Sequence, residues 1–408
     1  MHNAFADKLR LQWTAHYSRV TGKTAASGFS FALFDSVEQL PDALWDSLNN
    51  PQDIFLSTSY LSALEKSPPE NMKFKYALIY KENSPVGIAY FQILTLNHRL
   101  HKPPLRLLDS GKKNNLRDFH DKLADTATFT LLVCGNALIS GEHGFSFPNI
   151  PRTAALHAIA EIAYSLRKST LPRISVTLIK DFSVSDASTA TMLTQFGFYS
   201  FNAGPNMVVP LRKNWTTFDA YLNAMKPKYR KRAQSAIKKG SELQKLNLSL
   251  SEIIQYRNDI FNLYCQVADS RGFKIFVLSP DFFIALKRNL GEKFMCEAYF
   301  FNGTMIGFTT RIFNEAFLEG YTHGVAYERT REFELYQNFL LDDVKIAISG
   351  QLPFVNMGRT SIAMKSSIGA VPKDMVCYMR FSGRLSNQLV KLLFFFIKPR
   401  SEYCRNPF

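Results

Sequence analysis

The chain has 408 residues, 46% of them hydrophobic and 20% charged, which is enough apolar material for two packed domains of about 150–200 residues each. A formal net charge of +15 indicates an anionic partner, such as RNA, a nucleotide-linked substrate or an anionic membrane surface. The five cysteines are scattered without a CxxC pair, and the N-terminus lacks the apolar core of a signal peptide. A zinc site and secretion are therefore disfavoured, and a reducing, cytoplasmic compartment is expected.

The N-terminal half alternates between strand and helix patterns. Residues 1–27 are polar and weakly patterned, so a flexible N-terminal arm is expected, and residues 28–205 are predicted to form a first domain. Strands are predicted at 74–80, 86–94, 129–134 and 174–179, and helices at 154–166 and 187–196. A basic insertion at 95–126 contains a Pro-Pro step and few regular signals, which is typical of a functional loop or lid.

The C-terminal half continues after the turn signal Gly204-Pro205. A second domain is predicted at 206–381, followed by a basic and apolar tail at 382–408. Strands are predicted at 207–209, 294–300, 306–313, 317–321, 354–357 and 375–381, and helices at 227–239, 253–268, 281–289 and 335–349. Each half thus reads as strands, then helix, strand, helix and strand, which predicts α+β domains, each with a mixed β-sheet flanked by helices.

The two halves also share the positions of their glycines. Each has a hairpin whose second strand opens with an aliphatic-Gly step, a later strand that ends near a His-Gly pair, and a short helix that closes on a glycine. These are Val86-Gly87, His143-Gly144 and Gly197 in the first half, and Ile306-Gly307, His323-Gly324 and Gly369 in the second. Two matched halves imply a cleft between or within them.

The strongest charge pattern lies at the start of the second half. Residues 210–245 hold ten Lys or Arg and two acids, and a helix is expected to begin at Pro227 and to be capped by Gly240. Its polar side is basic, whereas Tyr229 and Ala233 lie on an apolar side. The basic residues suited to holding an anion are Lys228, Arg230, Lys231 and Arg232. A merely solvated helix face is the alternative.

The tail contains an apolar stripe at 389–398 whose longest run, LLFFFI, is too short to span a bilayer. Flanking lysines suit a helix that lies in the membrane interface and makes a peripheral contact at the inner face of the membrane. The alternative is a terminal helix that docks its Phe-rich face on the body of the protein.

Four segments of the second half carry a family resemblance: KYRKRAQSAIKKG, FFNGTMIGFTTRIFN, GYTHG and NMGRTSIAMKSSIGA. In this order they resemble the GNAT-fold acyltransferases of the FemAB-like, peptidoglycan-biosynthesis type. The resemblance covers about residues 212–380 and extends more weakly to the first half through PVGIAYF, GEHG and QFGF. It implies two tandem GNAT-like domains and transfer of an acyl or aminoacyl group to an amine, with no metal.

The resemblance also implies that the donor is a co-substrate, either acyl-CoA or aminoacyl-tRNA, and not a tightly bound cofactor. GNAT enzymes that use acyl-CoA carry an Arg/Gln-x-x-Gly-x-Gly/Ala turn before the central helix, which wraps the pyrophosphate in backbone N–H groups. The second half runs into that helix as THGVAYERTREFEL, without the turn. The first half offers Gly135, Gly141 and Gly144 before a helix, but not at the usual spacing.

The candidate catalytic residues are His323, as a general base, and Tyr321, as a proton donor expected on the same face of the strand. A histidine that caps the sheet and a core tyrosine are the alternatives. Arg359, which follows a short strand, is suited to holding a phosphate or carboxylate, with Thr360 and Lys365 beside it. The alternative is that Arg359 pairs with an acid such as Glu319. In the first half the corresponding polar pair is Glu142 and His143.

The sequence therefore predicts a cytoplasmic acyl- or aminoacyltransferase that modifies an amine on an anionic acceptor related to the cell envelope. The alternative is a non-catalytic protein that binds RNA or a membrane surface on a degenerate acyltransferase fold. A GxSxG hydrolase motif, a Walker A loop and a dinucleotide-binding GxGxxG motif are all absent from the sequence.

Overall fold

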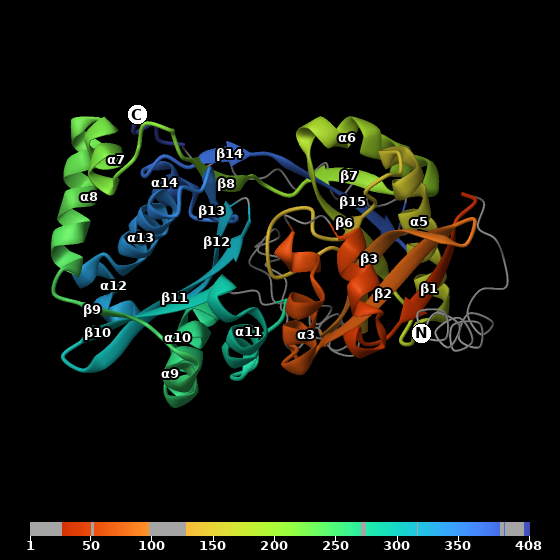
Figure 1. The fold of residues 1–408 in the computed structure, drawn as a ribbon, viewed down its shortest axis with the longest axis horizontal. Helices are drawn as coiled ribbons and strands as arrows, with labels where there is room; N and C mark the ends of the chain where they lie inside the picture. Colours follow the sequence, from red (N-terminus) through yellow and green to blue (C-terminus); the bar gives the residue numbers. More distant parts are fainter. Residues whose placement is uncertain are drawn as a thin grey trace, which may run out of the picture.

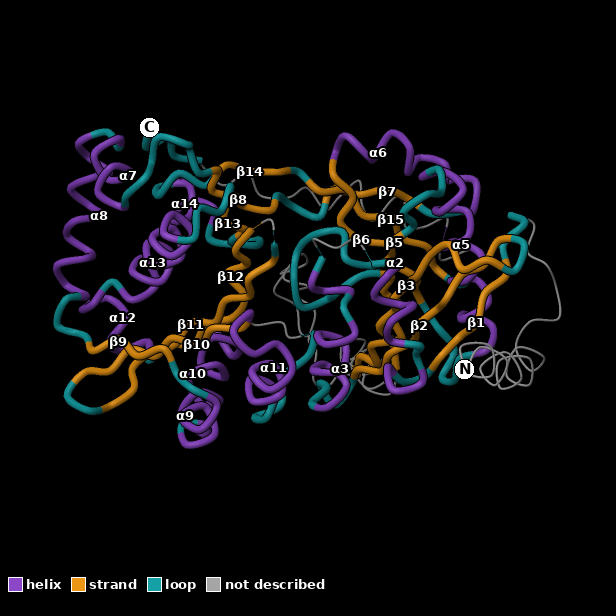
Figure 2. The backbone as a smooth tube through the Cα atoms, viewed as in Figure 1, coloured by secondary structure: helices purple, strands orange, loops and turns teal. Residues whose placement is uncertain are grey.

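Two mixed β-sheets lie side by side, each with helices packed on it (Figure 1), and Figure 2 shows the strands gathered in two groups. The computed structural model describes residues 27–49, 53–97, 128–270, 275–315, 317–383, 387 and 404–408. Most of the predicted N-terminal arm, the predicted loop from residue 98 onward, and the apolar stripe at 389–398 lie outside the described residues. The α+β class with two helix-flanked mixed sheets is confirmed.

The first sheet has the strand order β1-β2-β3-β4-β6-β15-β7, in which only β4 and β6 pair in parallel. Its strands are β1 (Ser30–Phe34), β2 (Met72–Lys81), β3 (Ser84–Asn97), β4 (Thr128–Cys134), β6 (Val176–Ser183), β7 (Tyr199–Asn202) and β15 (Met375–Phe381), and β5 (Phe145–Ser146) pairs with β3. Its helices are α2 (Asp42–Leu48), α3 (Thr58–Lys66), α5 (Arg152–Ser169) and α6 (Val184–Ala190), with 3-10 turns at Val37–Gln39, Ile54–Leu56 and Thr191–Phe196.

The second sheet has the order β14-β8-β13-β12-β11-β10-β9, in which β12 and β13 form the parallel pair. Its strands are β8 (Asn206–Pro210), β9 (Gln244–Asn247), β10 (Phe294–Phe301), β11 (Thr304–Asn314), β12 (Phe317–Val325), β13 (Phe354–Asn356) and β14 (Val371–Lys373). Its helices are α7 (Phe218–Ala224), α8 (Pro227–Gly240), α9 (Leu250–Gln255), α10 (Arg257–Ser270), α11 (Phe282–Leu290), α12 (Tyr327–Phe333), α13 (Leu335–Ser349) and α14 (Ile362–Ser366), with a 3-10 turn at Gly291–Lys293.

The last strand of the chain belongs to the first sheet, which corrects the expectation that it completes the second domain. β15 inserts between β6 and β7 and pairs antiparallel with both. β8, which follows the Gly204-Pro205 turn, pairs with β13 and β14 of the second sheet. Figure 1 shows the chain crossing from β14 to β15. An apolar run predicts a strand, but its partner is set by long-range hydrogen bonding that a local pattern does not encode.

Three local expectations also differ from the structure. The predicted helix at 253–268 is two helices, α9 and α10, which meet at Tyr256, and a capping box of Ser249 and Glu252 starts α9 three residues before the predicted bound. The predicted helix at 187–196 is α6 followed by a 3-10 turn. Gly240 is the last residue of α8 and is not a left-handed cap. A Cβ there would lie 2.6 Å from Nδ2 of Asn338, so close packing explains this glycine.

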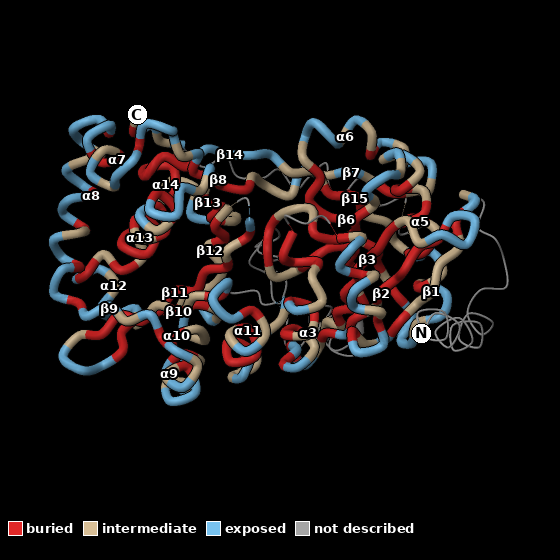
Figure 3. The backbone as a smooth tube through the Cα atoms, in the orientation of Figure 1, coloured by how far each residue is buried: buried red, intermediate tan, exposed pale blue. Residues whose placement is uncertain are grey.

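The two halves share a hydrophobic core. One cluster of buried side chains joins Trp45, Phe55 and Tyr60 of the first half to Phe282 and Phe308 of the second. Helices α3 and α11 pack against each other across the junction (Figure 1). The strands of both sheets are mostly buried, whereas α8 and α9 carry exposed stretches (Figure 3). The halves are therefore one packed body, joined by the shared core and by the crossing of β15.

The described end of the tail packs on the second half. Lys226 donates its backbone N–H to the carbonyl of Pro407, at 2.7 Å. The ring of Phe408 lies 4.7 Å from Trp215 and 5.6 Å from Tyr221, between centroids. Among the described helices, none combines the length and the apolar character that crossing a bilayer requires.

Candidate active site between the two halves

A cavity of about 560 Å³ lies between the two sheets and is lined by residues of both halves. It is bordered by the ends of both parallel strand pairs, β4–β6 in the first sheet and β12–β13 in the second. Cavities of about 300–1,000 Å³ that combine apolar walls with a few polar groups are typical ligand sites. This cavity is therefore the candidate active site.

The strands of the second sheet diverge at this cavity. The register of β12 with β13 ends at Glu319 and Asn356, although β12 continues to Val325. The residues from Gly320 to His323 line the cavity beyond that point. Since β13 has already ended there, the facing edge of β12 borders the cavity instead of a neighbouring strand.

A β-bulge in β12 separates Tyr321 from His323, which corrects the expectation that they share a face. Arg311 of β11 is opposite Gly320 and Thr310 is opposite Thr322, so Tyr321 is the extra residue. The ring of Tyr321 stacks on Phe282 of α11, with centroids 6.3 Å apart. The ring of His323 packs on Tyr336 of α13, with centroids 5.1 Å apart. The two side chains approach the cavity from opposite sides of the sheet.

Tyr321 ends a chain of hydrogen bonds that begins in the first half. The Nδ2 of Asn136 donates to the hydroxyl of Tyr60 at 2.8 Å, and that hydroxyl lies 3.0 Å from the hydroxyl of Tyr321. Either hydroxyl can donate in the bond between Tyr60 and Tyr321, so Asn136 and the two tyrosines form one buried hydrogen-bonded chain that reaches the cavity wall. Burial raises the pKa of Tyr321 well above its usual value, so its hydroxyl stays protonated at neutral pH.

Glu319 is a buried acid on the cavity wall, with only 1% of its surface exposed. Burial raises its pKa well above the usual value, against the opposing effects of a hydrogen bond with Asn356 and the charge of Lys365. One carboxyl oxygen, Oε2, has no hydrogen-bond partner. The raised pKa of Glu319 favours its uncharged form, and one of its oxygens beside the cavity accepts no hydrogen bond.

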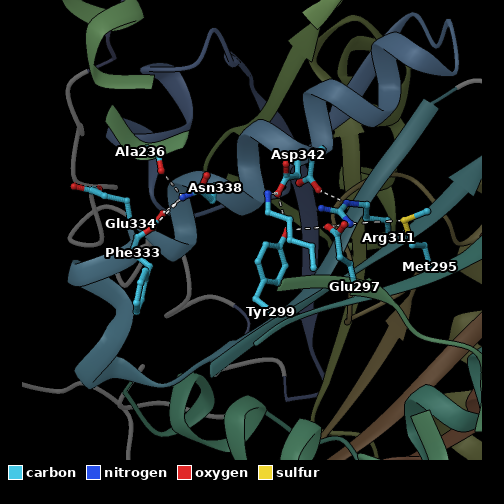
Figure 4. Close-up of polar contacts among 11 residues, drawn as sticks. Ala236, Met295, Glu297, Tyr299, Arg311, Phe333, Glu334, Asn338 and Asp342 are labelled. Atoms are coloured by element: carbon cyan, nitrogen blue, oxygen red, sulfur yellow. Dashed lines mark hydrogen bonds and ion pairs between the residues drawn. The ribbon is translucent and has the colours of Figure 1, made fainter. Parts of the chain in front are cut away.

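Asp343 of α13 lines the cavity on the side of His323. Its Oδ1 accepts from Nε of Arg311 at 2.5 Å, and Arg311 also donates to Glu297 at 2.9 Å (Figure 4). Its Oδ2 faces Gly320, because a Cβ at that glycine would lie 3.1 Å from it. Burial raises the pKa of Asp343 to about 6 against the opposing charge of Arg311, so the carboxylate is largely ionised at neutral pH.

In the first half, the equivalent strand ends are closed by Lys180. The register of β4 with β6 ends at Cys134 and Ile179. The Nζ of Lys180 donates to the carbonyls of Asn136 and Ile139, at 2.7 and 2.6 Å, and lies 2.7 Å from Oδ2 of Asp181. The ammonium group thus spans the gap that the corresponding strands of the second sheet leave to the cavity.

Asp181 pairs with two cationic side chains at the boundary of the halves. It has a left-handed φ of 70°, and it accepts from the backbone N–H of Gly141 at 3.0 Å and pairs with Lys180. Arg359 also pairs with Asp181, and not with Glu319. Burial alone would raise the pKa of Asp181, but the charges of Lys180 and Arg359 outweigh it and lower the pKa to about 2.

The other predicted ligand-holding residues near Arg359 differ in exposure. Lys365 is buried and donates to the carbonyls of Gly358 and Arg359, at 3.1 and 2.6 Å. Thr360 is exposed and has a φ of 71°. All three predicted residues line the cavity, so the structure brings Arg359, Thr360 and Lys365 together with Tyr321 and His323.

Glu142 and His143 do not line the cavity. Glu142 pairs with Arg152 at the start of α5. The Nδ1 of His143 lies 3.0 Å from Oδ1 of Asp53, and its ring packs on Phe55. Both residues therefore fasten the glycine-containing loop between β4 and α5 to its surroundings.

The basic residues of α8 also lie away from the cavity lining. Lys228, Lys231 and Arg232 are exposed and Arg230 is half-buried. The guanidinium of Arg230 donates to the carbonyl of Asn223 at 3.2 Å. They lie on α8, the outer helix of the second half (Figure 1), and the exposed charges among them form a basic surface.

The segment before the central helix, where GNAT enzymes that use acyl-CoA carry the pyrophosphate-binding turn, is a helix in this protein. α12 occupies the connection from β12 to α13, and both helices pack against α8. The side chain of Asn338, in the first turns of α13, donates to the carbonyls of Ala236 and Phe333, each at 2.9 Å (Figure 4). The N-terminal end of α13 is thus covered by the protein's own helices.

The sequence analysis did not identify several residues of this site. Tyr60, Asn136, Lys180, Asp181 and Asp343 lie in unremarkable strand and helix patterns, and only the chain's folding brings them together. A charged Lys180-Asp181 pair inside an apolar strand and an aspartate on the apolar face of α13 were the available signals. Within the described part of the chain, no group of three or more His, Cys, Asp or Glu side chains is arranged to hold a metal ion.

No protein-family model and no curated protein matches the sequence. Solved structures do match. The crystal structure of FemX is similar over 86% of this chain and 99% of its own, with a TM-score of 0.54 and 11% identity. A tandem GNAT protein from the clavulanic acid biosynthesis pathway is similar over 87% of this chain and 99% of its own, with a TM-score of 0.52 and 12% identity.

The chain therefore has the fold of tandem GNAT proteins, and at the level of fold the resemblance to FemAB-like GNAT acyltransferases is confirmed. Both matches span nearly the whole length of the known proteins, so the likeness includes the arrangement of two consecutive domains and not one alone.

Proposed function

We propose that this protein is an N-acyltransferase whose reaction takes place in the cavity between the halves, at the open end of the β12–β13 pair. The observation that carries this proposal is the contrast between the two strand pairs. Lys180 fills the gap in the first sheet, whereas the bulged edge of β12 borders the cavity in the second. The second half therefore holds the reacting centre, and the first half supplies one wall.

The bulge orients backbone donors toward the acyl group. The N–H of Thr322 turns toward β11, where it donates to Oγ1 of Thr310 at 3.0 Å. Beyond the bulge, the edge of β12 faces the side where β13 has ended. Backbone N–H groups in that position stabilise the oxyanion that develops on the acyl carbon.

The transfer requires two proton movements. The neutral amine nitrogen attacks the acyl carbon and forms the new C–N bond, and the bond from that carbon to the donor's sulfur or oxygen breaks. The nitrogen gives up one proton to a base, and the leaving sulfur or oxygen takes one from an acid. We assign Tyr321 as the acid, because it lines the cavity, burial raises the pKa of its hydroxyl, and that hydroxyl is hydrogen-bonded through Tyr60 to Asn136.

Two groups on the other side of the sheet are suited to act as the base, His323 and Asp343. We favour Asp343, because it is buried, oriented by Arg311 and has a pKa of about 6. The charged groups around it are Arg311, Asp342 and Glu297. A base with a pKa near the working pH is the most effective kind.

The acceptor is proposed to be an anionic, cell-envelope-type amine, held through Arg359, Thr360 and Lys365. The likeness to FemX supports this class at the level of fold. The donor is acyl-CoA or aminoacyl-tRNA, and because α12 and α8 cover the N-terminal end of α13, its phosphates must bind elsewhere. The basic surface of α8 is proposed to hold those phosphates or an anionic lipid surface at the inner face of the membrane.

Transfer activity of Tyr321→Phe, Asp343→Asn and His323→Gln variants tests the assignment, with product formation followed by mass spectrometry over a panel of acyl-CoA and aminoacyl-tRNA donors. We expect Asp343→Asn to lower kcat by about 10²–10⁴-fold and to remove a loss of rate below pH 6. Tyr321→Phe should lower kcat to a similar degree. Full activity in both variants, folded as judged by circular dichroism, contradicts the proposed centre.

The exposed basic helix gives some support to a second function, non-catalytic binding of RNA. Phosphate binding by several lysines and arginines makes affinity fall steeply with salt. Bulk tRNA is the probe, and Lys228→Glu with Lys231→Glu is the variant pair. Tight, salt-sensitive binding lost in this variant, with no transfer activity in the wild type, would favour the second function.

A further inference from the structure

The apolar part of the cavity points to the kind of acyl group transferred. We propose that it holds a long aliphatic chain, so that the donor carries a medium- or long-chain acyl group instead of acetyl. That the chain is an acyl group rests on the proposed transferase function. That the cavity binds an aliphatic chain rests on its walls alone.

The walls beyond the reacting centre are apolar on both sides. From the first half they are formed by Leu94, Leu131, Val133, Leu138 and Leu178, and from the second by Tyr264, Val267, Phe276 and Leu278. Several of these, including Leu131, Leu178 and Phe276, pack against the core cluster that the two halves share. Hydrocarbon buried against such walls gains free energy in proportion to its apolar area.

The charged groups of the cavity are engaged with one another or with the backbone. Lys180 and Arg359 both pair with Asp181, and Lys365 donates to two backbone carbonyls. Burial raises the pKa of Glu319, which favours its uncharged form. The polar groups of the cavity therefore lie around the strand ends of both sheets, and the wall beyond them is apolar.

The volume suits a chain and exceeds what an acetyl group needs. An apolar cavity of about 150 Å³ is enough to bind benzene, with six carbons. In the same proportion the whole 560 Å³ would hold about 22 carbons, and since part of the cavity is polar, a chain of roughly ten to twenty carbons is expected. An acetyl donor would leave most of this apolar surface without contact.

Saturated fatty acids of two to eighteen carbons are chain-only probes that bind without reacting. Their affinities are to be measured by isothermal titration calorimetry with the full-length protein. Burial of each methylene should raise affinity by about fourfold until the cavity is full, after which affinity should level off. An affinity that does not depend on chain length overturns the inference.

Variants of cavity residues test where the aliphatic chain binds. Leu138→Trp fills the cavity from the loop after β4 and should abolish binding of the longer acids, whereas Ile254→Trp, at an exposed position of α9, should leave it unchanged. Leu178→Ala enlarges the cavity and should move the point of levelling to longer chains. It also serves if Leu138→Trp fails to fold. Unchanged chain dependence in both cavity variants shows that the chain binds elsewhere and overturns the inference.

The Asp343→Asn variant separates this inference from the proposed function. It should keep its affinity for long fatty acids while losing transfer activity. If the wild-type protein binds long chains in this cavity but transfers no acyl group from any donor, the transferase proposal fails and the chain site stands. If the protein transfers acetyl as fast as long-chain acyl groups, the chain site fails and the transferase proposal stands.

Discussion

Asp181 has a backbone conformation that aspartate rarely adopts, with a φ of 70°, at the end of a buried strand. It accepts a backbone N–H from Gly141 and carries the charge that compensates Lys180 and Arg359. Because Lys180 and Asp181 come from the first half and Arg359 from the second, this one carboxylate links the loop after β4, the end of β6 and the loop after β13. Its cost in backbone strain is offset by these contacts.

Asp181 predicts an acid sensitivity. Its pKa is about 2 in the folded protein and 3.8 as the ordinary value, so its ionisation stabilises the fold by about 2 kcal/mol above pH 4. That contribution is lost as the pH falls from about 4 through 2. Urea unfolding of the wild type and of Asp181→Asn should therefore show a large stability gap at pH 7 that narrows toward pH 2. The exposed Glu70→Gln is the control, and a gap that is independent of pH contradicts this prediction.

Arg311 is a fully buried cation between Asp343 and Glu297. Its replacement by methionine leaves both carboxylates without their cation, so we expect a loss of about 3–5 kcal/mol in the free energy of unfolding. The matched control is Lys245→Met, since Lys245 pairs with the neighbouring Asp342 at a more exposed position, and its loss should cost at most about 1 kcal/mol. Equal losses in urea unfolding would show that Arg311 does not hold its partners as inferred.

The matched glycines of the two halves mark matched elements. Gly87 of β3 and Gly307 of β11 each lie beside a bulge, at Ile79/Tyr80 and at Tyr299/Phe300. Each glycine also admits a large ring: a Cβ would lie 2.3 Å from Phe147 at Gly87 and 3.0 Å from Phe339 at Gly307. The glycine that recurs in the two halves is thus required for the same reason in each, because an aromatic side chain packs directly on the strand there.

Gly324 predicts the effect of crowding between β12 and α10. A Cβ there would lie 2.6 Å from backbone atoms of Leu263 and Tyr264, which cannot rotate away. Gly324→Ala should therefore lower the free energy of unfolding by about 1–3 kcal/mol. At Gly350, after α13, an added Cβ lies no closer than 3.4 Å to another atom, so Gly350→Ala should change stability little. Thermal unfolding of both variants checks this, and equal melting temperatures would contradict it.

At the scale of the whole molecule, the crossing of β15 makes the first sheet depend on the second half of the chain. β15 fills the position between β6 and β7, and β8 lies between β13 and β14. The junction is reinforced by the shared core and by the packing of α3 on α11. Because the cavity is built from both halves, the crossing of β15 also fixes the geometry of the candidate active site.

Because β15 of the second half completes the first sheet, we predict that the first half does not fold by itself. A fragment of residues 1–205 lacks β15, which leaves β6 and β7 without their common partner. We expect it to show no cooperative unfolding transition when produced alone, and to form a stable complex when produced together with residues 206–408. A cooperative transition of the 1–205 fragment alone, at the melting temperature of the full chain, would contradict this dependence.

The sequence by itself determined the elements that follow a local period. The helix at 335–349 has the bounds predicted, the helix that begins at Pro227 is present, and the matched glycines reported two related halves. These features depend on apolar spacing and caps within a few residues of chain.

Only the tertiary structure decided which strand joins which sheet, which face Tyr321 takes, and which acid pairs with Arg359. β15 has the pattern of any apolar strand, the bulge at Tyr321 depends on the register with β11, and Asp181 lies 178 residues before Arg359. Each of these is a contact between segments far apart in the chain, whose partners are chosen by the packing of the whole. Local sequence patterns therefore determined the helices and strands, and long-range pairing between them determined the cavity.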